Sequence, residues 1–118
     1  MRFLWALPIL FICSCNTPQI PLPPPSWDSF SVTVDTEAEE IRVVGFVSLA
    51  GGQLSIIDPI SGNGIIRRIE ETGAFDTGFF SAQDGQRFDV SYTDGHDSSD
   101  PACGQVSYSP PSLQKCPN

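Results

Sequence analysis

Three carboxylates lie within seven residues near the C-terminal end, in Asp94-Gly95-His96-Asp97-Ser98-Ser99-Asp100. Carboxylate and hydroxyl oxygens are the ligands that Ca²⁺ prefers, and the ion takes about six to eight of them. Asp94, Asp97 and Asp100 are therefore candidate calcium ligands. Their spacing differs from that of the EF-hand loop, and Asp and Ser are also common in loops because their side chains cap turns. We expect a solvated turn without a metal or another cofactor.

The single histidine of the chain, His96, lies in the same stretch and could act as a general base. A hydrolase would also need a nucleophile beside this histidine and an acidic residue to orient it. No serine of the chain lies in a nucleophile turn of the G-x-S-x-G type. We therefore predict that the protein is not an enzyme.

The first residues of the chain have the layout of an export signal. Arg2 supplies a positive charge, and Phe3 to Ile12 form an uncharged, mainly apolar run of about ten residues. A membrane-spanning helix needs about 20 residues, so this run is too short to cross a bilayer. Pro8 inside the run further disfavours a stable helix.

The end of this run, Ile12-Cys13-Ser14-Cys15, resembles the lipobox of bacterial lipoproteins, which has an aliphatic residue, two small residues and a Cys. Cys13 departs from the Ser, Ala or Thr that is more usual at its position. The resemblance implies that Cys15 receives a lipid and that a lipoprotein signal peptidase removes residues 1–14. Two or more acyl chains anchor a protein stably. The alternative is an ordinary cleaved signal that leaves Cys15 free for a disulfide.

Removal of residues 1–14 leaves 104 residues, enough for one domain with a modest core. Five Lys and Arg then stand against 14 Asp and Glu, a formal charge of −9. This acidity disfavours nucleic acid and anionic lipid surfaces as partners. With Cys13 removed and Cys15 lipidated, Cys103 and Cys116 are left as one pair in an oxidising compartment. We therefore expect a disulfide between them.

Residues 15–28 are expected to form the lipidated Cys and a proline-rich tether. Five prolines lie between Asn16 and Asp28, and they favour an extended polyproline II chain. At ~3.1 Å per residue, such a stalk would reach about 40 Å from the membrane. Trp27 marks the transition to globular structure, and we expect it to cover the core rather than to stack on a ligand.

From Ser29 onward, apolar and polar residues alternate in the way that is typical of half-buried strands. No segment shows helical periodicity over three turns. Gly45 inside an apolar run suggests a bulge or a closely packed neighbour, and Pro110-Pro111 is expected to end regular structure. Residues 110–118 would then form a tail held by the disulfide. Seven short strands are expected, at 29–35, 41–49, 53–57, 65–70, 74–81, 87–93 and 104–109.

Short strands at this spacing indicate a single antiparallel β-sandwich over residues 29–109. The inward faces should carry Phe30, Val32 and Val34 of the first strand, Leu54 and Ile56 of the third, and Phe88, Val90 and Tyr92 of the sixth. The last strand contains Val106 and Tyr108.

Short motifs punctuate this region: Val43-Val44-Gly45, Gly52-Gln53-Leu54-Ser55-Ile56, Gly73-Ala74-Phe75 and Gly85-Gln86-Arg87-Phe88-Asp89-Val90. They resemble bacterial immunoglobulin-like domains and the related carboxypeptidase-regulatory-like modules, over about residues 30–95. The resemblance implies an immunoglobulin-like sandwich with a binding or spacer role and no catalytic residues. The chain lacks the internal repeat of tandem arrays and the Cys-Trp-Cys framework of antibody domains.

These patterns together predict an extracytoplasmic lipoprotein that acts as a non-enzymatic binding, adhesion or envelope-assembly module. The expected partners are the membrane through the lipid on Cys15, the lipoprotein-processing enzymes, and an envelope or surface protein. We expect the protein in the cell envelope, facing the periplasm or the exterior. Asn16 after Cys15 resembles outer-membrane sorting, which favours that membrane. The alternative is a small secreted enzyme or a calcium-dependent sensor built on the Asp94–Asp100 loop.

Overall fold

Alternating apolar and polar residues build eight strands in the computed structural model, which describes residues 22–49 and 51–117. Every pairing between strands is antiparallel. The elements in chain order are the short 3-10 helix η1 (Trp27–Ser29) and the strands β1 (Ser31–Asp35), β2 (Glu40–Phe46), β3 (Gln53–Ile57), β4 (Gly64–Arg68), β5 (Ala74–Ser81), β6 (Arg87–Thr93), β7 (Ala102–Tyr108) and β8 (Pro111–Lys115).

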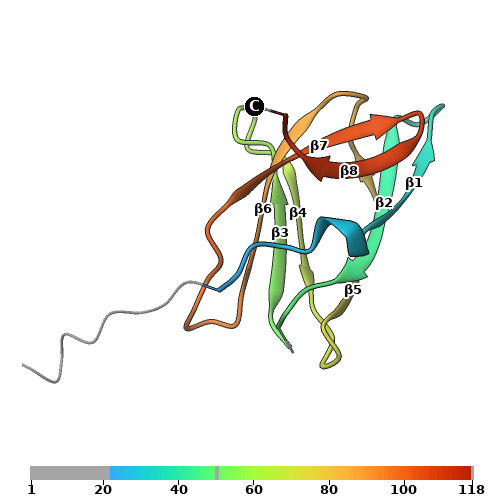
Figure 1. Cartoon of the computed structure of the whole chain (residues 1–118). Helices are drawn as coiled ribbons and strands as arrows, with labels where there is room; N and C mark the ends of the chain where they lie inside the picture. Colours follow the sequence, from blue (N-terminus) through green and yellow to red (C-terminus); the bar gives the residue numbers. More distant parts are fainter. Residues whose placement is uncertain (1–21, 50, 118) are drawn as a thin grey trace, which may run out of the picture.

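The strands form two sheets that pack against each other (Figure 1). The smaller sheet has the order β1-β2-β5, and the larger has the order β4-β3-β6-β7-β8. At one side of the molecule β5 lies next to β4, and at the other side β1 lies next to β8. The expected small all-β sandwich is thereby confirmed, with eight strands where the sequence predicted seven.

The faces that the two sheets turn toward each other are apolar. Ile41 and Val43 of β2 are fully buried, and alternate residues of β2 are exposed, which is the burial pattern of a strand with one face on the core. The inward positions predicted for β3 and β6 are also confirmed, with at most 1 % exposure at Leu54, Ile56, Phe88, Val90 and Tyr92.

Gly45 lies where the first aromatic residues of the core meet. A Cβ at this position would lie 2.8 Å from Cδ1 of Phe30 and 3.0 Å from the carbonyl oxygen of Ser29. The rings of Phe30 and Phe75 pack edge to face with centroids 5.2 Å apart. The close packing expected at Gly45 is therefore confirmed, because only a glycine leaves room for this contact.

The N-terminal boundary of the folded domain differs from the expected one. Residues 22–28, predicted as part of a free tether, lie against the larger sheet: the Leu22 amide donates to the Ser98 carbonyl over 3.2 Å, and the Tyr92 hydroxyl donates to the Pro23 carbonyl. Pro25 is buried, and the ring of Trp27 contacts Gly104. The three-stranded sheet is too narrow to cover all five strands of the larger sheet. Residues 22–28 cross the part of the larger sheet that it leaves uncovered (Figure 1).

The C-terminal boundary also differs, because regular structure continues beyond Pro110-Pro111. Strand β8 pairs with β7 from Tyr108 opposite Pro111 to Gly104 opposite Lys115, and Leu113 between them is fully buried. Proline is tolerated as the first residue of an edge strand because it removes no hydrogen bond from the interior of the sheet. Residues 111–115 are therefore a strand of the domain and not a tail.

Candidate binding groove

The acidic loop between β6 and β7 folds on its own hydrogen bonds. One carboxylate oxygen of Asp94 accepts from the amides of His96 and Asp97, each over 2.8 Å, and these bonds hold the pKa of Asp94 below its usual value. The Thr93 hydroxyl donates to the Asp97 carbonyl over 2.8 Å. Asp94 and Asp100 are exposed and Asp97 is half-buried. The Asp94 carboxylate thus caps a turn, as expected for Asp in a loop.

The structure does not bring the three predicted calcium ligands together. Within residues 22–49 and 51–117, no three His, Cys, Asp or Glu side chains are grouped so that they could hold a metal ion. His96 is exposed, and the hydrogen bond it makes in the loop comes from its backbone amide. The geometry of this loop therefore offers neither a coordination shell nor an oriented base.

Cys103 on β7 and Cys116 just after β8 lie at disulfide-bonding distance, with Cα atoms 5.4 Å apart. The Cys116 amide also donates to the Cys103 carbonyl over 3.0 Å, so backbone pairing continues past the last residue of β8. The predicted pairing of these two cysteines is borne out. Cys15, the predicted lipid attachment site, lies outside the described residues.

A groove of about 570 Å³ runs beside this cysteine pair, between the segment that precedes η1 and the ends of β7 and β8. The groove is mainly apolar, and two basic residues are among those that line it. Its volume falls within the range of about 300–1,000 Å³ that is common for ligand pockets. The lining residues are Pro24, Pro25, Trp27, Arg87, Ala102, Cys103, Lys115, Cys116 and Pro117.

Trp27 has a structural role on one side and forms part of the groove on the other. A Cβ on Gly104 would lie 2.9 Å from ring atoms Cη2 and Cζ3 of Trp27, so the ring lies directly on the backbone of β7. Its centroid is 5.5 Å from that of Phe30, in an edge-to-face arrangement. The expectation that Trp27 covers the core is therefore confirmed. The indole remains half-buried and also lines the groove.

The groove carries unpaired positive charge in an acidic protein. Five of the described residues are Lys or Arg, and the only ion pair in the described part of the chain joins Arg42 to Asp76. Arg87 and Lys115 are both exposed, and both line the groove. The combination of two unpaired cations with a mainly apolar lining distinguishes the groove from the other hollows of the surface.

A larger hollow, about 710 Å³, is lined in part by Glu39, Asp58 and Asp84. Asp58 is engaged within the protein: one oxygen accepts from the Ile60 amide and the other from the Gln86 side chain, each over 2.8 Å. These hydrogen bonds, the one from Ile60 above all, lower the pKa of Asp58. Asp58 therefore holds two loops together, and its carboxylate is already engaged within the protein.

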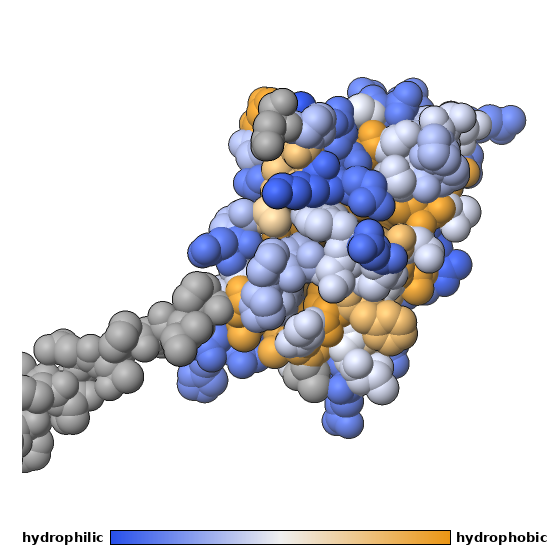
Figure 2. Space-filling model, viewed as in Figure 1, coloured by the Kyte–Doolittle hydropathy of each residue, from blue (hydrophilic) through white to orange (hydrophobic). Residues whose placement is uncertain are grey.

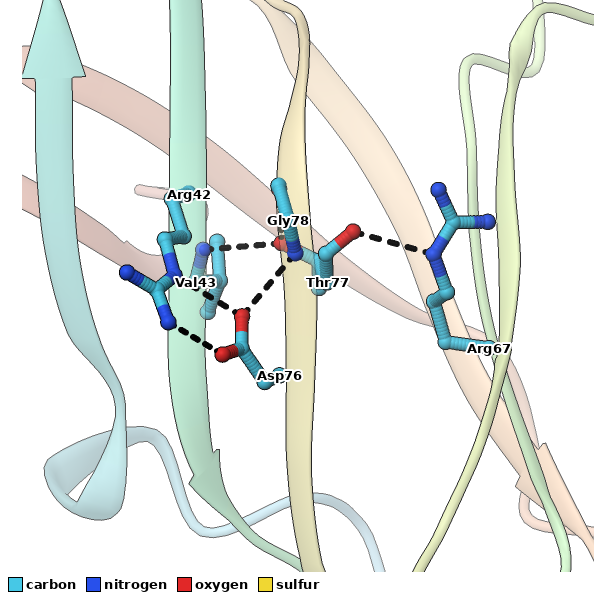
Figure 3. A network of polar contacts seen from close by, with 6 residues as sticks. All are labelled: Arg42, Val43, Arg67, Asp76, Thr77 and Gly78. Carbon is cyan, nitrogen blue, oxygen red and sulfur yellow. Dashed lines mark hydrogen bonds and ion pairs between the residues drawn. The ribbon is translucent and has the colours of Figure 1, made fainter.

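A third polar group surrounds a bulge in β5 (Figure 3). The pairing of β2 with β5 shifts between Arg42 and Val44, where Thr77 and Gly78 together face one residue of β2. Gly78 has a φ of 67°, a left-handed conformation that glycine adopts without strain. The buried Thr77 hydroxyl accepts from the Val43 amide over 2.9 Å and replaces the ladder bond that the bulge removes.

The charged residues of this group brace the bulge from both sides. Arg42 pairs with Asp76, whose carboxylate also accepts from the Gly78 amide over 2.9 Å, and these bonds hold the pKa of Asp76 well below its usual range. From β4 of the other sheet, Arg67 donates to the Thr77 carbonyl over 3.0 Å. Figure 3 shows Arg42 and Arg67 approaching the bulge from opposite sides. The network joins the two sheets at their edges.

The visible face of the molecule has no single broad apolar area. Figure 2 shows several orange areas separated by blue and white ones. A broad exposed apolar patch is the usual mark of a large protein interface. The visible face therefore lacks this mark of a large interface.

Sequence reasoning singled out Trp27 as a residue that covers the core and Cys103 and Cys116 as a pair, but it did not predict the groove that all three line. Arg87 lies in one of the short motifs quoted above and Lys115 lies in none. The two residues belong to different strands, so nothing local in the sequence connects them. Comparisons of the chain with protein-family models, curated proteins and solved structures found no match. Across residues 22–49 and 51–117 the structure contains no helix that is long and apolar enough to cross a membrane.

Proposed function

We propose that this protein is a lipid-anchored, extracytoplasmic binding module without enzymatic activity, displayed in the cell envelope. One observation carries the proposal: a short apolar run ends in Ile12-Cys13-Ser14-Cys15, and a folded β domain begins at Leu22. An acylated Cys15 would tie this domain to a membrane, and two or more acyl chains anchor a protein stably.

The distance between anchor and domain supports display close to the membrane. Only residues 16–21 separate Cys15 from the first docked residue, and a fully extended chain of this length spans about 25 Å. The docked segment 22–28 thus shortens the reach that the proline-rich composition alone suggested. The formal charge of −9 keeps the domain from lying flat on an anionic leaflet.

A two-sheet sandwich suits such a role because its core is independent of its surface, but the fold does not itself specify a function. The groove at Trp27 is the surface we propose for binding. It combines apolar area with free charge, whereas the other polar clusters described above are bonded internally. We place the partner among envelope or surface proteins, and we favour the outer membrane because of Asn16.

Fatty-acid labelling tests the anchor. The full chain, produced in a bacterial host, should incorporate a labelled fatty acid and partition into detergent, and Cys15→Ala should do neither. Cys13→Ala is the matched control, because alanine is a usual residue at that lipobox position and labelling should persist. If Cys15→Ala still labels, or if the wild-type chain does not, the anchor proposal is wrong.

A further inference from the structure

The groove at Trp27 has two unlike parts that a single ligand would have to satisfy. Trp27, three prolines, Ala102 and the cysteine pair line the groove, together with the charged residues Arg87 and Lys115. Neither cation forms an ion pair within the described residues, although 14 acidic residues are available in the chain. Both cations of the groove therefore remain available to an outside anion.

The apolar lining decides against a bare anion as the ligand. An inorganic ion would use Arg87 and Lys115 and leave the indole of Trp27 and the proline rings in water. Burial of apolar area contributes about 25 cal/mol per Å², so a ligand with an apolar body gains from the groove what a small ion cannot. The ligand should thus carry its negative charge next to apolar groups.

The charge of the whole domain decides against a membrane surface. An anionic leaflet presents many charges at once, and the formal charge of −9 would repel it over a Debye length of about 8 Å at physiological salt. A narrow ligand that enters the groove meets Arg87 and Lys115 at close range instead. A flexible chain with one or two carboxylates satisfies this condition.

The shape of the groove favours an extended chain. Pro24 and Pro25 have fixed φ angles and no free amide, so they present a rigid apolar wall beside a flat aromatic ring. Extended, proline-containing peptides bind such aromatic grooves at a low entropic cost because they are already stretched out. Flanking carboxylates would then select the sequence by pairing with the two cations.

From these observations we propose that the groove binds an extended acidic peptide segment of a partner protein, with apolar or proline residues against Trp27 and carboxylates toward Arg87 and Lys115. This inference rests on the proposed function, since it names the class of partner for the displayed module. It does not depend on the anchor, because the groove is complete within the described residues.

The chain offers a direct reporter for this site. Its two tryptophans are Trp5 and Trp27, so removal of residues 1–14 leaves the groove indole as the only one. The probe is a fluorescein-labelled peptide, Glu-Pro-Leu-Glu-Pro-Leu-Glu-Pro, titrated into the exported protein without residues 1–14 and followed by polarisation. The unlabelled peptide, followed by tryptophan emission, gives the second readout. Its control replaces every Glu by Gln, and vesicles of phosphatidylglycerol form a separate arm.

We expect saturable binding of the Glu peptide with a change in tryptophan emission, and binding at least about tenfold weaker for the Gln peptide, equivalent to about 1.4 kcal/mol. Arg87→Glu and Lys115→Glu should each weaken binding about fivefold or more, and raising the salt concentration should weaken it further. Arg68→Glu is the matched control, because it changes an exposed arginine outside the groove by the same two charges and should bind as the wild type does.

Three results would overturn the proposal: equal binding of the Gln peptide, equal losses in Arg68→Glu and Arg87→Glu, or binding to the vesicles without binding to the peptide. Arg87 and Lys115 are exposed, so both variants should unfold within a few degrees of the wild type, which separates lost binding from lost folding. If labelling of Cys15 succeeds and the peptide titration fails, only the ligand assignment falls. If the titration succeeds and labelling fails, only the anchor falls.

Discussion

Gly104→Ala provides a stringent test of the docked N-terminal segment. The new methyl group would lie 2.9 Å from Cη2 and Cζ3 of Trp27 and 3.1 Å from Cδ1 of Leu113, so one or both side chains must move. Overpacking of this kind costs about 1–3 kcal/mol. For a domain of this size the melting temperature falls by about 4–8 °C per kcal/mol, so a loss of about 5–20 °C is expected.

The decisive measurement is a double-mutant cycle in denaturant. Trp27→Ala alone should destabilise the domain by about 2–3 kcal/mol, since the ring is half-buried. In that background the methyl at residue 104 has room, so Gly104→Ala should cost less by at least about 1 kcal/mol. The tryptophan emission of Gly104→Ala should also shift to the red, because the displaced indole meets more water.

One result would refute the reasoning. If Gly104→Ala is equally destabilising with and without Trp27, then Leu113 alone accounts for the cost and the indole does not lie on β7. The docking of residues 22–28 and the groove built on it would then have to be rejected together.

Four further predictions concern the bulge and its ion pair, the cysteine pair and the acidic loop. Thr77→Val should cost about 1–3 kcal/mol in denaturant unfolding because it leaves a buried β2 amide without a partner, and a loss near zero would contradict the bulge geometry. Arg42 lowers the pKa of Asp76, so the Asp76 carboxylate contributes fully to stability above the ordinary carboxyl pKa of about 4. This contribution is lost as the pH falls through the lowered pKa. The melting temperature of Asp76→Asn should therefore depend less on acid than that of the wild type. Cys116→Ser should destabilise the domain by about 3 kcal/mol, and two free thiols in the non-reduced wild-type protein would contradict the pairing. Millimolar calcium should raise the melting temperature no more than sodium chloride of equal ionic strength, and a larger rise that Asp97→Asn abolishes would restore the calcium site.

Local patterns in the sequence were sufficient for the sandwich and for part of its core. A period of two places alternate residues on opposite faces of a strand, so the buried positions of β3 and β6 follow from the chain alone. The role of Asp94 as a turn cap also follows from its residue type and its neighbours. These predictions succeed because each depends on residues that are close together in the chain.

Local rules also explain where the prediction was wrong at both ends of the domain. Prolines favour an extended chain, but they do not determine whether that chain is solvated or lies on a sheet, and the uncovered part of the larger sheet decided this for residues 22–28. Pro110-Pro111 interrupts hydrogen bonding without preventing an edge strand from starting there, and the pairing of Leu113 with Val106 decided that β8 forms.

The sequence by itself determined the class of fold, the inward positions of β3 and β6, the cysteine pair and, through its N-terminal pattern, the proposal of a lipid anchor. Only the tertiary structure brought Trp27, Arg87 and Lys115 to one groove and placed Arg67 against the bulge of β5. The physical reason is that strand periodicity is a property of neighbouring residues. A binding surface depends instead on which distant segments meet, and this is set by how two sheets of unequal width cover each other.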